Sequence, residues 1–307
     1  MKNIVSTINR FFTGPTAPEP LALFRIAISF FALIQIAVLL PDWMWFYGPN
    51  GMIPWDLSEP LAATHMPVLS DVQSLLSWTH ISANGVVYLV TGLYILSLTG
   101  LLVGFKTHLM GFVALLMQTL LNTTSHLTAY GVETFLHISL FYCTILPVGI
   151  KWSVDAINKT SKIPGYLITL SIRLVQLHLC IMYLSCGIEK AGGMQWWTGE
   201  AIWIAMQQDQ FHNVNIDWMA QYPVIPQLLC WSTILIEGLY PAGMLWKKSR
   251  KFWFISIISM HAFIAVFLGL HLFGSLMILM NASIFGIGMF KIKSRSKNVI
   301  GPYLRIV

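Results

Sequence analysis

Long apolar segments follow one another along almost the whole of this chain, and they limit what it can fold into. We count eight of them, at about residues 20–41, 83–105, 108–122, 128–150, 166–188, 225–246, 252–270 and 272–290. A membrane-spanning helix needs about 20 consecutive apolar residues, and only the third segment is clearly shorter. The last two segments lie so close together that a re-entrant pair is the alternative for them.

Charge supports the same conclusion. Only 10% of the 307 residues are charged, whereas a soluble domain has roughly 25%. The sequence therefore predicts an all-α, polytopic integral membrane protein with about eight transmembrane helices. It excludes a soluble globular enzyme, a disordered chain and a protein that binds nucleic acid through a basic face.

Basic residues are distributed unequally among the connections between these segments. If the N-terminus is cytoplasmic, the inner connections hold 15 of the 18 lysines and arginines, whereas the outer connection at 42–81 holds none. Arg25 and Arg173 fall within spans, and only Lys190 is assigned to the outer face. By the positive-inside rule, we expect an even number of spans and two cytoplasmic termini. The expected domains are an N-terminal segment at 1–19, a transmembrane domain at 20–290 with outer loops at about 42–82 and 189–224, and a basic cytoplasmic tail at 291–307.

The two outer loops are rich in aromatic residues. We expect aromatics such as Trp43 and Tyr47 to lie in the membrane interface, and Gly48-Pro49-Asn50-Gly51 to form a tight turn. Residues 68–79 predict a short helix on the membrane. Residues 198–208 predict a second, amphipathic helix with Thr198 as its N-cap.

Cysteine and histidine spacing gives no indication of a metal site. The four cysteines lie in or beside apolar runs without CxxC spacing: Cys143, Cys180, Cys186 and Cys230. Ten residues separate His261 from His271, which on one helix is about 15 Å and too far to share a metal ion. We therefore expect neither a disulfide framework nor a metal cofactor.

Ionisable residues within membrane spans are energetically costly and are functional candidates by default. They are Arg25, Glu133, Arg173, His178, Glu237 and His261. We interpret Arg25, Arg173 and Glu237 as structural intramembrane charges, with Glu237 a candidate ion-pair partner of Arg25.

Lys190 and His126 are the leading candidates for chemistry at the outer face. Lys190 ends the fifth span, and a lysine in a partly apolar pocket loses its proton more readily than in water and can act as a base. The alternative is an interfacial lysine that extends to water. His126, at the outer end of the third span, could donate a hydrogen bond to an oxyanion or could be an ordinary polar helix-end residue. Both alternatives remain open on the residues alone.

Several short pieces of the chain carry a family resemblance in their order and spacing. They are Leu23-Phe24-Arg25, Gly48-Pro49-Asn50-Gly51, Ser125-His126 through Tyr130-Gly131, Trp152-Ser153-Val154-Asp155, Cys186-Gly187-Ile188-Glu189-Lys190, and His261 followed twelve residues later by Phe273. With these pieces, residues 20–290 resemble the HTTM (horizontally transferred transmembrane) domain, the membrane portion of vitamin K-dependent gamma-glutamyl carboxylase. The resemblance is to a short bacterial-type member without the C-terminal soluble region, in a bacterial inner membrane.

The resemblance implies an enzyme that acts on a reduced quinone at the outer membrane face. Lys190 matches the family's base for vitamin K hydroquinone oxygenation, and His126 matches a residue that stabilises developing negative charge. In this hypothesis Glu189 and Trp197 shape the quinone pocket, and His261 lines it. The implied cofactor is a reduced vitamin K or menaquinone-type quinol. The implied partners are a membrane lipid or quinone and a peptide or protein substrate. The family's paired lysine is replaced here by Glu189-Lys190.

Two other classes of function remain open. A non-catalytic membrane factor would use the aromatic outer loops to bind a peptide or protein for maturation or export, as the resemblance to members associated with maturation of a sporulation-delaying toxin implies. A channel or transporter would line a path with charges such as Glu133 and Arg173, although the sequence shows no inverted repeat.

Overall fold

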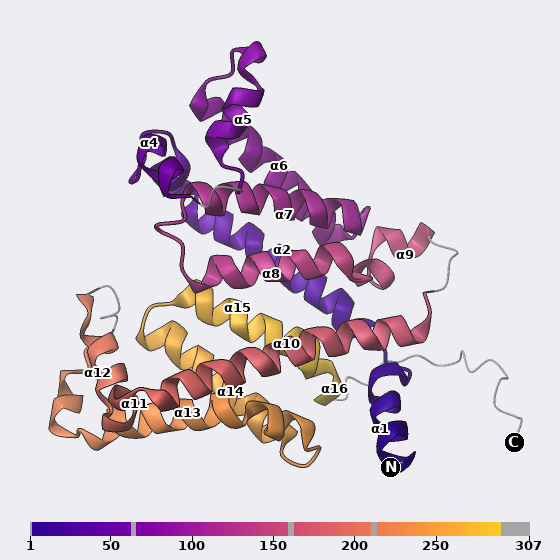
Figure 1. Cartoon of the computed structure of the whole chain (residues 1–307), viewed down its shortest axis with the longest axis vertical. Helices are drawn as coiled ribbons and strands as arrows, with labels where there is room; N and C mark the ends of the chain where they lie inside the picture. The colour runs from indigo at the N-terminus through magenta and orange to yellow at the C-terminus, as the bar shows by residue number, and fades with distance from the viewer. Residues whose placement is uncertain (1, 63–65, 159–162, 210–213, 290–307) are drawn as a thin grey trace, which may run out of the picture.

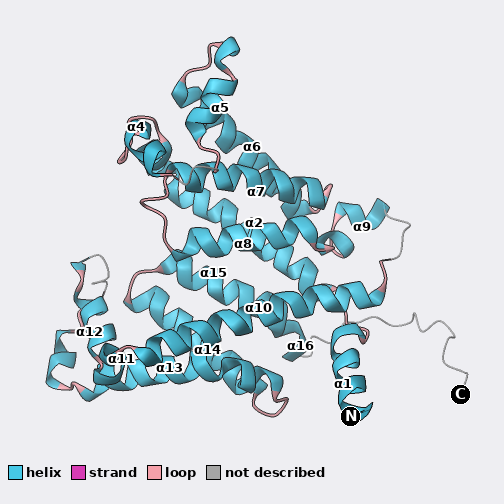
Figure 2. Cartoon of the chain, viewed as in Figure 1, coloured by secondary structure: helices cyan, strands magenta, loops and turns pink. Residues whose placement is uncertain are grey.

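The computed structural model describes residues 2–62, 66–158, 163–209 and 214–289. All regular elements in these parts of the chain are helical, and they contain no strand (Figure 2). The principal helices are α1 (Lys2–Thr13), α2 (Glu19–Leu39), α6 (Ala83–Val103), α7 (Thr107–Thr124), α8 (Gly131–Ile145), α10 (Gly165–Gly192), α13 (Val224–Leu245), α14 (Arg250–Phe267) and α15 (His271–Asn281). A π-helical turn at Ala282–Gly286 continues α15 into α16 (Ile287–Met289). A helix therefore lies within each of the eight predicted apolar segments.

Five helical segments are long and apolar enough to cross a membrane. They are Glu19–Tyr47, Ala83–Val103, Gly165–Gly192, Val224–Leu245 and Arg250–Phe267. Two more apolar helices, Gly131–Ile145 and His271–Gly286, are shorter. The predicted all-α membrane fold is thus confirmed at this level, with several helices able to span a bilayer.

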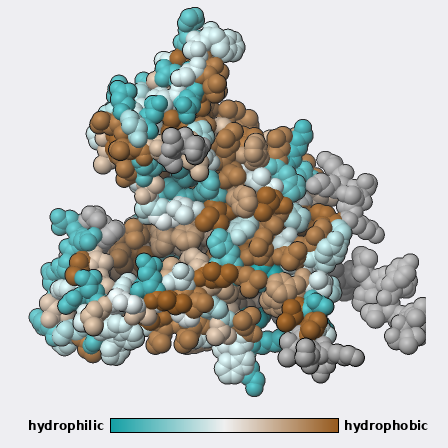
Figure 3. All heavy atoms as spheres, in the orientation of Figure 1, coloured by the Kyte–Doolittle hydropathy of each residue, from teal (hydrophilic) through white to brown (hydrophobic). Residues whose placement is uncertain are grey.

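The long helices lie side by side, and α2 packs against both halves of the bundle. It contacts α6, α8, α10 and α15, while α10 packs on α13 and α14 packs on α15. Figure 1 shows that the connections predicted to be inner gather at one end of the bundle, with α1 and α9 (Val154–Asn158). The connections predicted to be outer gather at the other end, with α4 (Trp55–Ser58), α5 (Leu69–Leu75) and α12 (Glu200–Gln207). On the face in Figure 3, apolar side chains cover much of the middle, and hydrophilic ones gather near α5 and α12.

Arg25 does not pair with Glu237, so that prediction was wrong. The Arg25 side chain is fully buried and donates to backbone carbonyls. Its acceptors are the carbonyl oxygens of Leu101 and Leu102 at 2.5 Å, Trp152 at 2.5 Å and Val148 at 3.3 Å. The last carbonyls of a helix lack intrahelical partners, so a guanidinium with several donors can satisfy them at once.

Gly104 and Asp155 fix the path of the chain in the same region. Gly104 follows α6 with a φ of 77°, and a Cβ there would collide with Ser153 and lie 3.1 Å from the Arg25 guanidinium carbon. Asp155 accepts from the backbone N–H groups of Lys106 and Thr107, at 2.9 and 2.8 Å, and thereby caps α7. Arg25 and the Trp152–Asp155 segment therefore join α2, α6, α7 and α8 at the end of the bundle where the connections predicted to be inner gather.

A close crossing of α10 and α13 occurs at two glycines. A Cβ on Gly187 would come within 2.6 Å of the Gly238 Cα. The helix backbones can approach this closely because Gly187 has no side chain at the crossing. Lys190 lies one turn after Gly187, and Glu237 immediately precedes Gly238, so the crossing brings these two side chains together.

The outer loops differ from the expectation in two respects. Trp43 and Tyr47 are buried in the core, not in a membrane-facing belt, and the Trp43 indole N–H donates to Thr91 Oγ1 at 2.8 Å. Helix α12 begins after Gly199, whose φ is 91°, so Thr198 is not its N-cap. The tight turn and the short helix within 68–79 are both present: Gly51 N–H donates to the Gly48 carbonyl at 3.1 Å, and α5 spans Leu69–Leu75.

Candidate functional site

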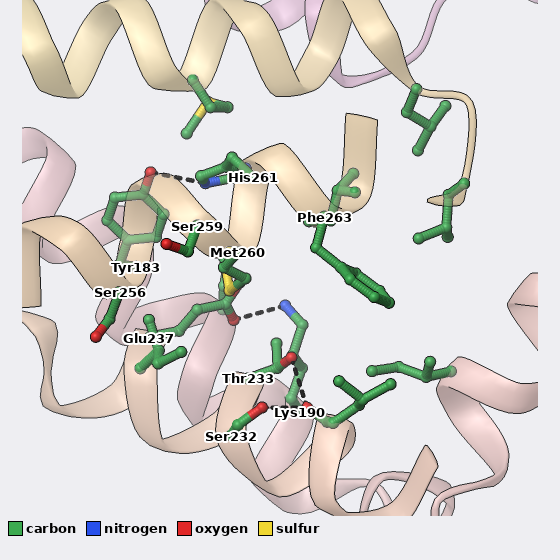
Figure 4. Close-up of a pocket in the computed structure, with 18 of the residues that line it drawn as sticks. Tyr183, Lys190, Ser232, Thr233, Glu237, Ser256, Ser259, Met260, His261 and Phe263 are labelled. Carbon is green, nitrogen blue, oxygen red and sulfur yellow. Dashed lines mark hydrogen bonds and ion pairs between the residues drawn. The ribbon is translucent and has the colours of Figure 1, made fainter. Parts of the chain in front are cut away.

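A cavity of about 690 Å³ lies among α10, α12, α13, α14 and the start of α15. Its walls are mostly apolar, with contributions from residues such as Ile236, Met260 and Phe273. The polar and charged groups that reach it are Tyr183, Lys190, Ser232, Thr233, Glu237, Ser256, Ser259 and His261 (Figure 4). Ligand sites commonly have this size and composition, in which a few polar groups orient a largely apolar molecule.

Lys190 and Glu237 form an ion pair at the wall of this cavity. The Lys190 Nζ lies 2.7 Å from the Glu237 Oε2, and the two side chains are 22% and 8% exposed. The ammonium also lies 5.3 Å from the centre of the Trp196 ring, within the range of a cation–π contact. Lys190 is in the last turn of α10, where the helix dipole favours a positive charge. The pair is thus an acid and a base in ionic contact beside an apolar space.

A chain of buried hydrogen bonds runs from α13 through α15 to the cavity. The Tyr240 hydroxyl donates to Asn281 Oδ1 at 2.7 Å, and Asn281 Nδ2 donates to the Tyr183 hydroxyl oxygen at 2.7 Å. The orientation of the amide is fixed because Nδ2 also lies 2.8 Å from the Met277 carbonyl, which can only accept. The Tyr183 hydroxyl lies in turn 2.9 Å from His261 Nε2 (Figure 4).

This series of hydrogen bonds determines which nitrogen of the neutral His261 ring carries the proton. Because Tyr183 accepts from Asn281, its own hydrogen is available for His261 Nε2, which then acts as an acceptor. The neutral ring accordingly carries its proton on Nδ1. His261 is 3% exposed, and its Nδ1 has no hydrogen-bond partner among the described residues. An unsatisfied buried donor costs about 1–3 kcal/mol, so an acceptor atom brought beside this N–H would be stabilising.

The cavity brings together some of the predicted site residues and not others. Lys190 and His261 line it, whereas His126 does not: its Nδ1 lies 3.0 Å from the Thr123 carbonyl at the end of α7. Glu189 borders a shallow outer recess beside Lys190, not the cavity. Trp197 also lies outside it and donates to the Ala191 carbonyl at 2.8 Å. The neighbouring Trp196 occupies the position against Lys190.

The region around His126 contains a separate polar cluster. Glu133 accepts from the Tyr130 backbone N–H at 2.9 Å and from Gln35 Nε2 at 3.2 Å. The cluster holds the start of α8 against α2.

Arg173 contacts the N-terminal helix α1 through Phe11. Its Nε donates to the Phe11 carbonyl at 3.1 Å, and its guanidinium lies 4.3 Å from the centre of the Phe11 ring. The intramembrane charges Arg25, Glu133, Arg173 and Glu237 therefore have four different surroundings and line no common cavity among those described. Within the described ranges, no group of three or more His, Cys, Asp or Glu residues is arranged to hold a metal ion.

Sequence reasoning missed most of the groups that surround Lys190. It treated Glu237 as a structural charge, and it did not select Tyr183, Trp196 or Asn281. The available signal was the pair of helical glycines, since Gly187 precedes Lys190 by one turn and Gly238 directly follows Glu237.

The sequence and the structure were compared with known proteins. No protein-family model, curated protein or solved structure matches the chain at a significant level.

Proposed function

We propose that the chain is a multi-pass protein of the cell membrane, with all eight apolar helices crossing, that binds a reduced quinone in the Lys190 cavity and promotes loss of a hydroxyl proton from it. The observation that supports this most strongly is the placement of the Lys190–Glu237 pair and of His261 on one apolar cavity, where His261 Nδ1 is buried without a hydrogen-bond partner among the described residues. The resemblance to the HTTM domain favours a vitamin K-type quinol as the class of ligand.

The cavity suits such a molecule. Its volume of about 690 Å³ and its apolar walls fit a fused aromatic ring with the first part of an isoprenoid chain. A hydroquinone carries two oxygens on opposite sides of one ring. The ring can therefore place one oxygen near Lys190 while the other accepts from His261 Nδ1. We infer that the ligand enters from the lipid phase, because its chain is insoluble in water.

The residues divide the proton chemistry between them. Lys190 passes one ammonium proton to Glu237, and the free amine then takes the hydroxyl proton. The restored ammonium stabilises the negative charge on that oxygen. His261 donates its Nδ1–H to the other oxygen and orients the ring. In this proposal His261, not His126, is the hydrogen-bond donor, because His261 lines the cavity.

An oxygenation assay tests the proposal. The full chain is incorporated in lipid nanodiscs with vitamin K hydroquinone and dioxygen, and the epoxide is measured by chromatography. We expect epoxide from the wild-type chain and a loss of at least ~100-fold in Lys190→Ala, the usual contribution of a general base. Lys248→Ala, an exposed lysine at the other end of the bundle, is the matched control. Absence of wild-type turnover, or equal turnover in Lys190→Ala, would contradict the proposal.

Exposed aromatic side chains favour a second candidate, a factor that binds a peptide or protein at the outer end. Trp78 is 78% exposed beside Leu75 at 76%, and Trp45 is 58% exposed. Aromatic residues are enriched in protein interfaces. A photo-crosslinker placed at Trp45 or Trp197 would capture a specific polypeptide if this function is correct, and only lipid if it is not.

A further inference from the structure

A second, smaller cavity lies near the inner end of α10, far along the helix from Lys190. Its volume is about 180 Å³, and it is enclosed by α10, the segment after α1, the α13–α14 turn and the π-helical turn before α16. Figure 1 shows α1 and α16 at this end of the bundle. Two arginines, Arg173 of α10 and Arg250 at the start of α14, line it together.

Each guanidinium group uses only some of its N–H donors in hydrogen bonds within the protein, and the others remain available. Arg173 donates Nε to the Phe11 carbonyl and Nη1 to Gln176 Oε1, at 3.1 and 2.6 Å. Arg250 donates Nε to the Met244 carbonyl at 2.7 Å. Arg173 Nη2 and both Nη atoms of Arg250 have no hydrogen-bond partner in the described part of the chain. These contacts therefore position two guanidinium groups in one pocket and leave several of their N–H donors available for a ligand.

No carboxylate neutralises these arginines among the described residues. The described ion pairs join Lys151 to Glu19 and Lys190 to Glu237, and neither includes Arg173 or Arg250. The two acidic residues at this end are already engaged, Glu19 by Lys151 and Asp155 by the start of α7. The sequence after residue 289 contains no Asp or Glu. Two like charges that share a partly enclosed pocket repel each other, and an anion between them would remove this repulsion.

The depth of the pocket fits a lipid headgroup. Helix α10 has 28 residues and is about 42 Å long, which exceeds the ~30 Å hydrocarbon core. Arg173 is eight residues from its first residue, or about 12 Å along the axis, near the boundary between headgroups and acyl chains. Apolar residues such as Ile172, Leu177 and Phe285 line the rest of the pocket. Basic pockets between transmembrane helices bind anionic headgroups in this way.

We propose that this pocket binds the phosphate group of an anionic phospholipid, with Arg173 and Arg250 as the two donors. The planar guanidinium matches the geometry of phosphate oxygens and forms two parallel hydrogen bonds with them. The bound lipid would join α1, α10 and α14 at the inner membrane face. This site is separate from the Lys190 cavity and does not depend on the function proposed for it.

Native mass spectrometry of the full chain in detergent tests the proposal with phosphatidylglycerol as the probe. We expect Arg250→Gln to weaken binding at least about tenfold, as expected when hydrogen bonds to a charged group are lost. Lys248→Gln removes the same charge from an exposed position in the same turn, and we expect a change of less than about twofold from screened charge alone. Arg173→Lys keeps the positive charge but loses the planar guanidinium that forms two parallel hydrogen bonds, so this variant should also bind phosphatidylglycerol more weakly. Unfolding temperatures without lipid show whether each variant is folded.

Three results would overturn the proposal. If Arg250→Gln and Lys248→Gln weaken phosphatidylglycerol binding equally, the binding depends only on the overall charge of the protein and not on this pocket. Equal binding of uncharged diacylglycerol would mean that the pocket recognises acyl chains. Displacement of phosphatidylglycerol by millimolar inorganic phosphate would identify a soluble phosphate, not a lipid, as the ligand.

Discussion

Lys190 and Glu237 each make it possible for the other to lie inside an apolar bundle. The charge of either side chain alone would be poorly solvated there, and their contact of 2.7 Å offsets much of that cost. From the sequence, Lys190 and His261 stand out because they are ionisable residues in apolar segments. The partner of Lys190 could not be identified in the same way, because pairing depends on which helices touch. That is why Glu237 was assigned to Arg25, whose real acceptors are backbone carbonyls that no sequence motif marks.

Glu237→Gln tests the energetic role of the pair. We expect it to lower the free energy of unfolding by about 2 kcal/mol, because the Lys190 ammonium loses its counter-charge in a partly buried position. The double variant Lys190→Met with Glu237→Gln should recover part of this loss, since no unpaired charge remains. Denaturant unfolding in detergent measures both. Additive losses in the double variant would show that the two residues do not stabilise each other.

Gly104→Ala tests the junction around Arg25. Its positive φ disfavours a side chain, and the added Cβ would collide with Ser153, so we expect a loss of at least about 2 kcal/mol in unfolding free energy. Gly92→Ala in the interior of α6 is the matched control, because no atom lies within 4 Å of its Cβ. The control should be neutral or slightly stabilising. Equal stability of the two variants would contradict the role of this junction.

At the scale of elements, the helices were predictable and their ends were less so. Apolar segments of about 20 residues predict where α2, α6, α10, α13 and α14 lie, because each must satisfy its backbone hydrogen bonds internally in a membrane. The start of α12 was misplaced because Thr198 looks like an N-cap, whereas the left-handed conformation of Gly199 ends one short helix and begins the next. Trp43 was wrongly assigned to the membrane interface. Its burial depends on packing against α6 through Thr91, and the sequence alone does not reveal this contact.

Gly187→Ala tests the crossing that positions the site. The new Cβ would meet the backbone of Gly238 on α13, so we expect α10 and α13 to separate and the free energy of unfolding to fall by about 1–3 kcal/mol. Hydroquinone binding should weaken as well, because Lys190 moves away from Glu237. Gly238→Ala lies at the same crossing but faces open space and should change little. If the two substitutions have the same effect, the close approach at Gly187 does not position the pair.

At the scale of the whole molecule, the connections separate into two groups at opposite ends of the bundle (Figure 1). This arrangement agrees with the division made from basic residues alone, because antiparallel packing of successive helices returns the chain to the same end every second helix. The charge pattern could therefore predict the grouping of the connections. It could not predict the cavities, which depend on how helices distant in sequence pack together.

Accessibility labelling tests the topology. In a variant without native cysteines, Thr79→Cys should react with a membrane-impermeant maleimide added outside cells, and Lys248→Cys should react only after the membrane is opened. His271→Cys, at the exposed first residue of α15, should label from outside if all eight helices cross. External labelling of Lys248→Cys would contradict the proposed orientation.

Equilibrium binding of a short-chain naphthohydroquinone to the full chain in nanodiscs tests the central claim most directly. The claim is that the cavity beside Lys190 holds the ligand and that His261 Nδ1–H is its hydrogen-bond donor. We expect His261→Phe to weaken binding by about tenfold, the effect of one hydrogen bond in a buried site, and His126→Phe to leave it unchanged. Loss of binding in His126→Phe with full binding in His261→Phe would contradict the account.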